Sequence, residues 1–196
     1  MLIASDKISK VGEGFTVPQD ALIIDAKGKH VTPGLIDAHS HSGISGGVNE
    51  GTHAVTSEVR IGDVINSYNI DFYRELAGGL TAANLLHGSA NPIGGQNAVV
   101  KLRWGMLPEA FKISTALPGI KFALGENVKQ SNRGDDFTTR YPQTRMGVEQ
   151  IMRDRFKAAL DYEKAWDDYN SAKNKRGLIP PRRDLELEAL LEILRG

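Results

Sequence analysis

The feature that most constrains this chain is an apolar segment, residues 35–41, that becomes polar at its C-terminal end. It follows Pro33 and Gly34, a pair that favours a turn. The segment predicts a β-strand that is buried at its start and open at its end. Side chains two residues apart on a strand lie on the same face, so His39 and His41 are expected to present two imidazoles together.

Two adjacent imidazoles can bind one divalent cation, and neutral imidazole suits Zn²⁺ and neighbouring first-row metals. The chain has no cysteine, which excludes disulfides, thiolate nucleophiles and thiolate metal ligands. Any metal is therefore held by nitrogen and oxygen, and it needs ligands beyond His39 and His41. The alternative is that both are ordinary surface histidines, the commoner role of an isolated His-x-His pair.

Composition sets wider limits on fold and partners. The chain has 196 residues, of which 40% are hydrophobic and 24% charged, typical of one soluble globular domain with room for a small appendage. Lys plus Arg and Asp plus Glu number 24 each, so no net charge favours nucleic acid or an anionic membrane. No apolar run approaches the roughly 20 residues that span a bilayer. Neither nucleic acid nor a membrane is an expected partner.

The order of expected elements favours an α/β fold. Helical spacing covers residues 61–76 with an interruption at 66–69, and a tight Gly-rich loop is expected at 89–96. Parallel neighbours need long crossovers, so strands separated by helices or long connections predict parallel pairing. Besides 35–41, the predicted strands are residues 80–86, 98–104 and 120–124.

The two ends of the chain differ in character. Residues 1–31 predict a small β element, with short strands at 2–4 and 21–25. The last third predicts two amphipathic helices, at about 147–176 and about 184–195, the second capped by Asp184.

Residues 28–41, Gly-Lys-His-Val-Thr-Pro-Gly-Leu-Ile-Asp-Ala-His-Ser-His, resemble the signature of the amidohydrolase superfamily. In that family a small β domain leads into the first strand of a (β/α)₈ barrel, and the two histidines bind a divalent metal at the C-terminal mouth. More specific motifs resemble a subgroup close to imidazolonepropionase and the metal-dependent dipeptidases; they lie at residues 80–84, 88–96, 119–127 and 144–147.

The resemblance implies a metal site with His39, His41 and a bridging carboxylate or carboxylated lysine from the fourth barrel strand. Glu126, at the end of the strand predicted for 120–124, is the expected third ligand. Lys121 is the less favoured candidate because it lies at the start of that strand. A solvated turn residue is the alternative interpretation of Glu126.

His87 lies at the end of the strand predicted for residues 80–86. The resemblance suggests that it binds substrate, whereas a hydrogen-bonded structural histidine is the favoured alternative. His30 and His53 fall in turn and loop contexts and are assigned no role. No residue is assigned as the catalytic acid or base.

The implied activity is hydrolysis of a C–N bond, in a non-peptide or dipeptide amide, by a metal-activated water. Zn²⁺ is the expected cofactor and a small-molecule amide the expected substrate of the full-length relatives. A barrel of this kind takes about 250 residues, so we expect residues 32–196 to form its first half. Residues 1–31 would be a partial β domain clipped before Met1, which leaves cellular location open.

A half-barrel is expected to show little or no activity alone and to expose strand edges. We therefore expect a homo-oligomer or a strand-exchanged dimer. The alternative function is a non-catalytic half-barrel that acts as a scaffold or oligomerisation module, with His39 and His41 unused. A phosphate site in the loop 91–97 ranks last, because this loop lacks the Gly-Lys-Ser/Thr ending of a P-loop. Four residues form either an anion-binding patch or a polar surface loop: Arg133, Arg140, Tyr141 and Arg145.

Overall fold

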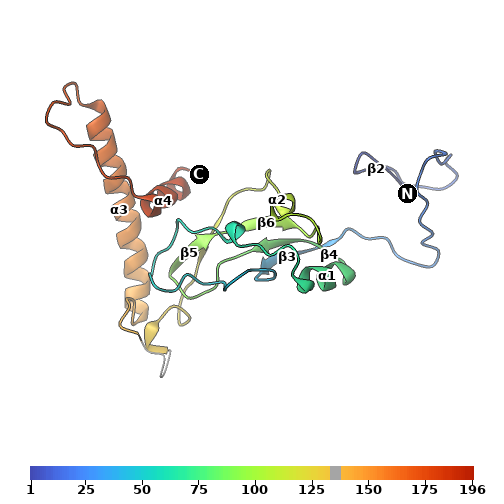
Figure 1. Cartoon of the computed structure of the whole chain (residues 1–196), viewed down its shortest axis with the longest axis horizontal. Coiled ribbons are helices and arrows are strands. Elements are labelled where there is room, and N and C mark those ends of the chain that lie inside the picture. The colour runs from blue at the N-terminus through green and yellow to red at the C-terminus, as the bar shows by residue number, and fades with distance from the viewer. Residues whose placement is uncertain (133–137) are drawn as a thin grey trace. The chain divides into compact units, whose positions relative to one another are not determined.

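The computed structural model describes residues 1–132 and 138–196 (Figure 1). The chain divides into two compact units, Met1–Pro33 and Gly34–Gly196. Each unit has its own secondary structure, and the residues singled out from the sequence as metal or substrate ligands all lie in the second.

The first unit contains one β-hairpin. Strands β1 (Leu2–Ala4) and β2 (Lys7–Lys10) pair antiparallel. Ser5 and Asp6 join them with φ of 50° and 61°, the left-handed conformation that a two-residue hairpin turn requires. The strand predicted at residues 21–25 is wrong: this segment has no strand and its apolar side chains are exposed. Propensity alone does not make a strand without a neighbour to pair with.

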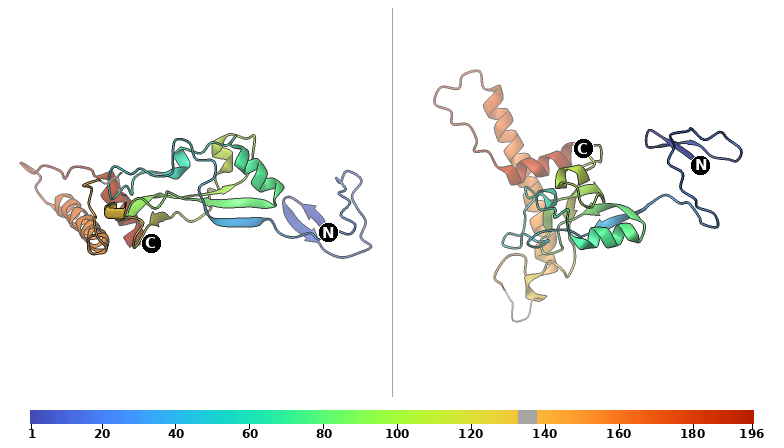
Figure 2. Two further views of the ribbon diagram at one scale, coloured as in Figure 1. Left: turned by 90° about the horizontal axis from the view of Figure 1, so that it is seen from below. Right: turned by 45° about the vertical axis from the view of Figure 1, so that its right-hand side comes forward.

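The second unit is built on a three-stranded sheet with the order β3-β4-β6. Strands β3 (Leu35–Ser40) and β4 (Leu80–Leu85) pair parallel, whereas β4 and β6 (Ala98–Lys101) pair antiparallel. Helix α1 (Ile70–Ala77) lies in the crossover between the two parallel strands (Figure 2). This crossover satisfies the need of parallel neighbours for a long connection.

The interruption predicted at Asn66–Asn69 is confirmed, but the segment before it forms only one short turn. A 3₁₀ turn, η1 (Ile61–Asp63), comes first, and α1 begins only at Ile70. The Asn69 side chain accepts a hydrogen bond from the backbone N–H of Asp71 at 2.8 Å and so caps the helix start. Asparagine side chains compete for backbone partners, which is why the apolar spacing did not continue as one helix.

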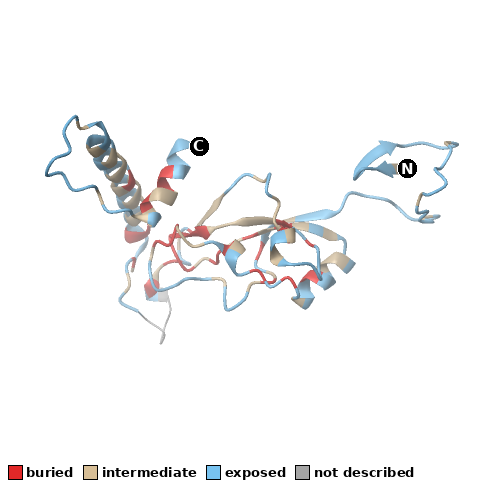
Figure 3. Cartoon of the chain, turned by 45° about the horizontal axis from the view of Figure 1, so that its top comes forward, coloured by how far each residue is buried: buried red, intermediate tan, exposed pale blue. Residues whose placement is uncertain are grey.

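One buried cluster lies between α1 and the sheet (Figure 3). Phe72 of α1 packs against Phe111 of the short helix α2 (Pro108–Phe111), with ring centroids 5.2 Å apart. This core fixes the sheet from which the histidines project. Its buried members are Ile61, Ile65, Phe72, Ala83, Leu85, Val100, Leu102 and Phe111.

A second sheet pairs β5 (Ile93–Gln96) with β7 (Ile120–Phe122) in antiparallel fashion. The sequence predicted a loop over 89–96, so the strand there is a correction. Gly94 is needed for close packing, because a Cβ at this position would lie 2.8 Å from Nδ1 of His87. Because Gly94 and Gly95 are buried against the His87 ring, β5 offers no open loop that could bind a phosphate.

Two helices pack on the β5–β7 pair. Helix α3 (Arg145–Ser171) follows the 3₁₀ turn η2 (Gln130–Asn132), and α4 (Leu185–Arg195) ends the chain. Ala159 of α3 shares one buried cluster with three leucines of α4, and Figure 3 colours the buried parts of both helices red. The shared core consists of Val55, Ile93, Ala159, Leu187, Leu190 and Leu191, with Ile120, Phe122 and Phe156 packed against it.

The fold is mixed α/β, as the sequence predicted. The expectation of parallel pairing holds for β3 and β4, whereas the β4–β6 and β5–β7 pairs are antiparallel. The sheets of the described residues have two, three and two strands and do not by themselves trace a barrel. Within the described part of the chain, no helix is both long and apolar enough to cross a membrane.

Candidate metal centre

His39 and His41 meet at the C-terminal end of β3. Their Nε2 atoms lie 3.2 Å apart, and the two rings are close to perpendicular, with centroids 5.1 Å apart. Two imidazoles on one tetrahedral Zn²⁺ place their nitrogen atoms about 3.3 Å apart, because each Zn–N bond is about 2.0–2.1 Å. The separation of the two nitrogen atoms therefore fits a shared divalent cation.

A backbone carbonyl orients the ring of His41. Its Nδ1 lies 2.8 Å from the carbonyl oxygen of Leu86, the residue that follows β4. A carbonyl oxygen only accepts hydrogen bonds, so Nδ1 carries the proton and donates it. Nε2 consequently keeps its lone pair and faces His39, which is the tautomer that a metal ligand needs.

The structure brings Lys121, from the middle of β7, to the two histidines. Its Nζ lies 3.4 Å from Nε2 of His39 and 3.4 Å from the carbonyl oxygen of His87. Burial lowers the pKa of Lys121. The positive charge of Lys121 is the main cause that lowers the pKa of His39, with burial and His41 adding to it. Both effects favour the neutral, ligand-competent forms of these side chains.

Glu126, the third ligand predicted from the sequence, is not brought into this cluster. It forms ion pairs with Lys129 and Arg145. Gly125, three residues after the end of β7, has a φ of 70° and turns the chain, so Glu126 does not continue the line of the strand. Among the described residues, no group of three His, Asp or Glu side chains could hold a metal.

His87 is buried, and both of its ring nitrogen atoms are engaged. Nε2 accepts a hydrogen bond from the backbone N–H of Glu50 at 2.8 Å, and Nδ1 lies 2.9 Å from the carbonyl oxygen of Gly88. Burial lowers the pKa of His87 and so favours the neutral ring. This geometry describes a histidine that supports the loop around it, with no ring nitrogen left to meet a substrate.

The arginines that suggested an anion patch have separate partners. Arg140 donates hydrogen bonds to backbone carbonyls, whereas Arg145 pairs with Glu126. Arg133 lies outside the described residues. The arginines with described side chains therefore do not converge on one anion position.

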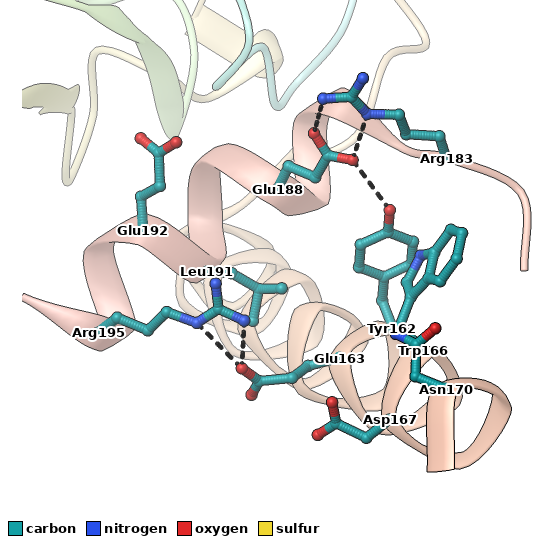
Figure 4. A pocket seen from close by; sticks show the side chains of 10 residues that line it. All are labelled: Tyr162, Glu163, Trp166, Asp167, Asn170, Arg183, Glu188, Leu191, Glu192 and Arg195. Carbon is teal, nitrogen blue, oxygen red and sulfur yellow. Dashed lines mark hydrogen bonds and ion pairs between the residues drawn. The ribbon is translucent and has the colours of Figure 1, made fainter. Parts of the chain in front are cut away.

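A pocket of about 490 Å³ lies between α3 and α4 and shares no residue with the histidine cluster (Figure 4). Arg195 pairs with Glu163 across it, and Arg183 pairs with Glu188, which also accepts a hydrogen bond from the Tyr162 hydroxyl. These contacts join the two helices. The pocket is therefore part of the α3–α4 interface, separate from the candidate metal centre.

The sequence ranks Lys121 below Glu126 and gives no sign of two backbone carbonyls at the site. Lys121 lies in the middle of the three-residue strand β7, which the sequence pattern does not show. The carbonyl oxygens of Leu86 and His87 carry no side-chain signal that could have revealed them. The motif at residues 119–127 contains both candidates, and only the fold decides which of them faces the histidines.

Comparison with known proteins relates the whole chain to hydrolases. No protein-family model matches it. It is 33% identical over 203 residues to amidohydrolase tasK of Hapsidospora irregularis, covering 92% of this chain and 20% of that protein. A dihydroorotase of Geotalea daltonii is 49% identical over 41 residues, which are 21% of this chain and 10% of that enzyme. A 5-methylthioadenosine/S-adenosylhomocysteine deaminase of Thermococcus sibiricus is 50% identical over 40 residues, 20% of this chain and 9% of that protein.

A solved structure agrees with these sequence matches. The crystal structure of an amidohydrolase from Thermotoga maritima superposes with a TM-score of 0.82 at 35% sequence identity, covering 99% of this chain and 50% of that one. The chain thus spans half the length of that protein and a fifth of tasK. The fold is mixed α/β, and the two proteins that the chain resembles along most of its length are both named amidohydrolases. The chain belongs to the amidohydrolase superfamily.

Proposed function

We propose that this chain carries the first part of the divalent-metal site of a hydrolase that acts on C–N bonds in small-molecule amides, with Zn²⁺ as its metal. The observation that carries the proposal is the 3.2 Å separation of the His39 and His41 Nε2 atoms. The Leu86 carbonyl supports it, because this contact fixes the tautomer that leaves the His41 lone pair facing His39.

Lys121 replaces Glu126 as the proposed third ligand. An ammonium group cannot bind a cation, but a neutral amine can attack carbon dioxide: the N–C bond forms, one N–H proton leaves to solvent, and a carbamate remains. The burial that lowers the pKa of Lys121 raises the fraction of neutral amine available for this step. The carbamate would supply a negatively charged oxygen ligand beside His39.

A bound cation would supply Lewis acidity, which activates water and polarises a substrate carbonyl. The chain's own residues hold that position: His39 in its neutral form, His41 through the Leu86 carbonyl, and Lys121 through the His87 carbonyl. We propose little or no hydrolysis by the chain alone, because none of the residues described around the metal position is assigned as the acid/base group that hydrolysis needs.

We also propose that the second unit is a half-barrel that associates with a second copy of itself. The match to half of the Thermotoga maritima amidohydrolase supports the half-barrel. The sequence predicted that β3 is buried at its start, but Leu35 and Ile36 are 62% and 73% exposed. Exposed apolar side chains on a strand offer a surface for association. Light scattering should give twice the chain mass or more; a monomer at micromolar concentration would contradict the association.

Metal analysis tests the proposed function directly. The purified chain is expected to retain one Zn²⁺ per chain after dialysis against micromolar Zn²⁺, and His39→Ala is expected to lose it. His30→Ala is the matched control, because His30 is an exposed histidine of the first unit. A wild-type chain that binds no metal, with unfolding unchanged in His39→Ala, would favour the scaffold function over the hydrolase.

A further inference from the structure

We propose that Arg140 is a positioning residue for the candidate metal centre. It fixes the segment at residues 86–91, whose carbonyl oxygens orient His41 and Lys121. The inference rests on the proposed function, because the position that it supports is the proposed metal position.

The Arg140 guanidinium meets four oxygen atoms on two loops that are far apart in the sequence. The two N–H groups of Nη1 are shared among three acceptors: the carbonyls of Gly51 and His53, the latter at 2.8 Å, and Oδ1 of Asn91 at 2.9 Å. Nη2 donates to the carbonyl of Ala90 at 2.7 Å. A planar guanidinium with several fixed N–H donors can join several carbonyls at once, which a lysine ammonium cannot do in the same geometry.

Asn91 continues the connection on the buried side. It is fully buried, and its Nδ2 donates to the Glu50 carbonyl at 2.6 Å and to the Thr56 hydroxyl at 2.8 Å. Its Oδ1 accepts a hydrogen bond from Nη1 of Arg140. The Asn91 amide is thus used at both ends, so loss of Arg140 leaves a buried acceptor without this donor.

Hydrogen bonds also join the two loops directly, without Arg140. The backbone N–H of Gly88 donates to the carbonyl of Val48 at 2.6 Å, and the N–H of Ala90 donates to Oδ1 of Asn49 at 3.2 Å. The His87 ring accepts the Glu50 N–H. Arg140 adds side-chain hydrogen bonds to both loops.

One end of the segment at residues 86–91 lies beside the proposed metal position. Its first residue, Leu86, accepts a hydrogen bond from Nδ1 of His41, and the next, His87, accepts one from Lys121. A shift of the segment would move both carbonyls and so rotate His41 and displace Lys121. Sub-ångström changes of this kind matter, because ligand orientation sets metal affinity.

Cobalt titration of the purified chain tests the proposal, with Co²⁺ absorption as the signal. Arg140→Ala is expected to bind Co²⁺ about tenfold more weakly or worse, and millimolar guanidinium is expected to restore part of that loss. The Co²⁺ affinity of Arg140→Lys should lie between those of the wild type and Arg140→Ala. This variant also tests the proposal if Arg140→Ala does not fold. Arg153→Ala is the matched control, since Arg153 is exposed on α3 and pairs only locally with Glu149. Wild-type affinity in folded Arg140→Ala, or in Arg140→Lys if only that variant folds, would overturn the proposal.

A metal-free measurement separates this proposal from the proposed function. Long-range ¹H–¹⁵N NMR reports which nitrogen of His41 carries the proton. We expect the Nδ1–H form in the wild type and a mixture of tautomers in the folded Arg140 variant. If the wild type binds no Co²⁺ but the tautomer shifts, the metal site fails while the positioning role stands. An unchanged tautomer overturns the positioning role whether or not metal binds.

Discussion

The histidine end of β3 and the α3–α4 pair hold their side chains in different ways. At the histidine end, single backbone carbonyls on a distant segment orient His41 and Lys121. Between α3 and α4, a continuous apolar core carries the contact, and ion pairs such as Arg195–Glu163 lie around it. The first region is determined by a few directed hydrogen bonds, and the second by buried area.

The contrast teaches where each region is vulnerable. Apolar packing tolerates loss of a surface charge but not loss of a buried side chain. Directed hydrogen bonds to carbonyls tolerate little displacement, because a small shift leaves a donor or acceptor unpaired. We therefore expect stability to respond most to the helix pair and metal affinity to respond most to the loops around His87.

The largest expected effect is on stability, from Leu190→Ala in α4. Leu190 is fully buried, and its truncation should lower the free energy of unfolding by about 2–5 kcal/mol. Co²⁺ affinity of the folded variant should not change. Chemical denaturation and cobalt titration check both points, with the exposed Leu194→Ala as control. Equal losses in the two variants would mean that the helix pair is not a packed core.

A smaller loss of unfolding free energy is expected from Gly94→Ala, which places a methyl group against the His87 ring. Overpacking of this kind costs about 1–3 kcal/mol. In contrast to Leu190→Ala, the variant should also bind Co²⁺ more weakly, because His87 supports the Lys121 contact. Gly78→Ala is the control, since Gly78 lies at the end of α1 in a right-handed helical conformation and a Cβ there makes no contact shorter than 3.4 Å. Unchanged metal affinity in Gly94→Ala would separate the His87 loop from the metal centre.

Acid should weaken the region around His87. Burial holds the pKa of His87 below the usual value of about 6.5 that it regains on unfolding. The unfolded chain therefore takes up the proton first, so the stability contributed by neutral His87 is fully present above that value and is lost as pH falls below it. His87→Gln should show a flatter decline of unfolding free energy between pH 7 and 5. Parallel curves for the two proteins would contradict this role.

The smallest effect is expected on the surface of α3. Arg153→Ala removes an exposed i, i+4 pair with Glu149, worth about 0.5 kcal/mol or less. Thermal unfolding in low and high salt should show a small difference that salt removes. A loss of stability in Arg153→Ala larger than that in Gly94→Ala would contradict the expectation that surface charges on α3 contribute little.

Local patterns explain what the sequence could predict. His39 and His41 lie together because strand side chains alternate, a rule that needs no tertiary information. The cap at Asp184 is confirmed, since its side chain accepts the N–H of Leu187 at 3.1 Å. Apolar spacing also predicts one apolar stripe on α4, and three of its four leucines, Leu187, Leu190 and Leu191, are buried, whereas Leu194 is exposed.

Tertiary contacts explain what the sequence could not predict. The choice between Lys121 and Glu126 depends on where β7 ends and how Gly125 turns the chain, which no local pattern fixes. Strand β5 was predicted as a loop because Gly94 and Gly95 suggest a turn, whereas the structure uses them to admit the His87 ring and Val59. Backbone carbonyls as orienting groups cannot be read from side-chain types at all.

X-ray absorption spectroscopy of the zinc-loaded chain tests the shared cation position most directly. We expect zinc with two imidazole ligands at about 2.0–2.1 Å and additional oxygen scatterers, the imidazole signal disappearing in His41→Ala. Zinc that binds without imidazole scattering, or binding that survives in His41→Ala with an unchanged spectrum, would contradict the assignment of His39 and His41 as ligands.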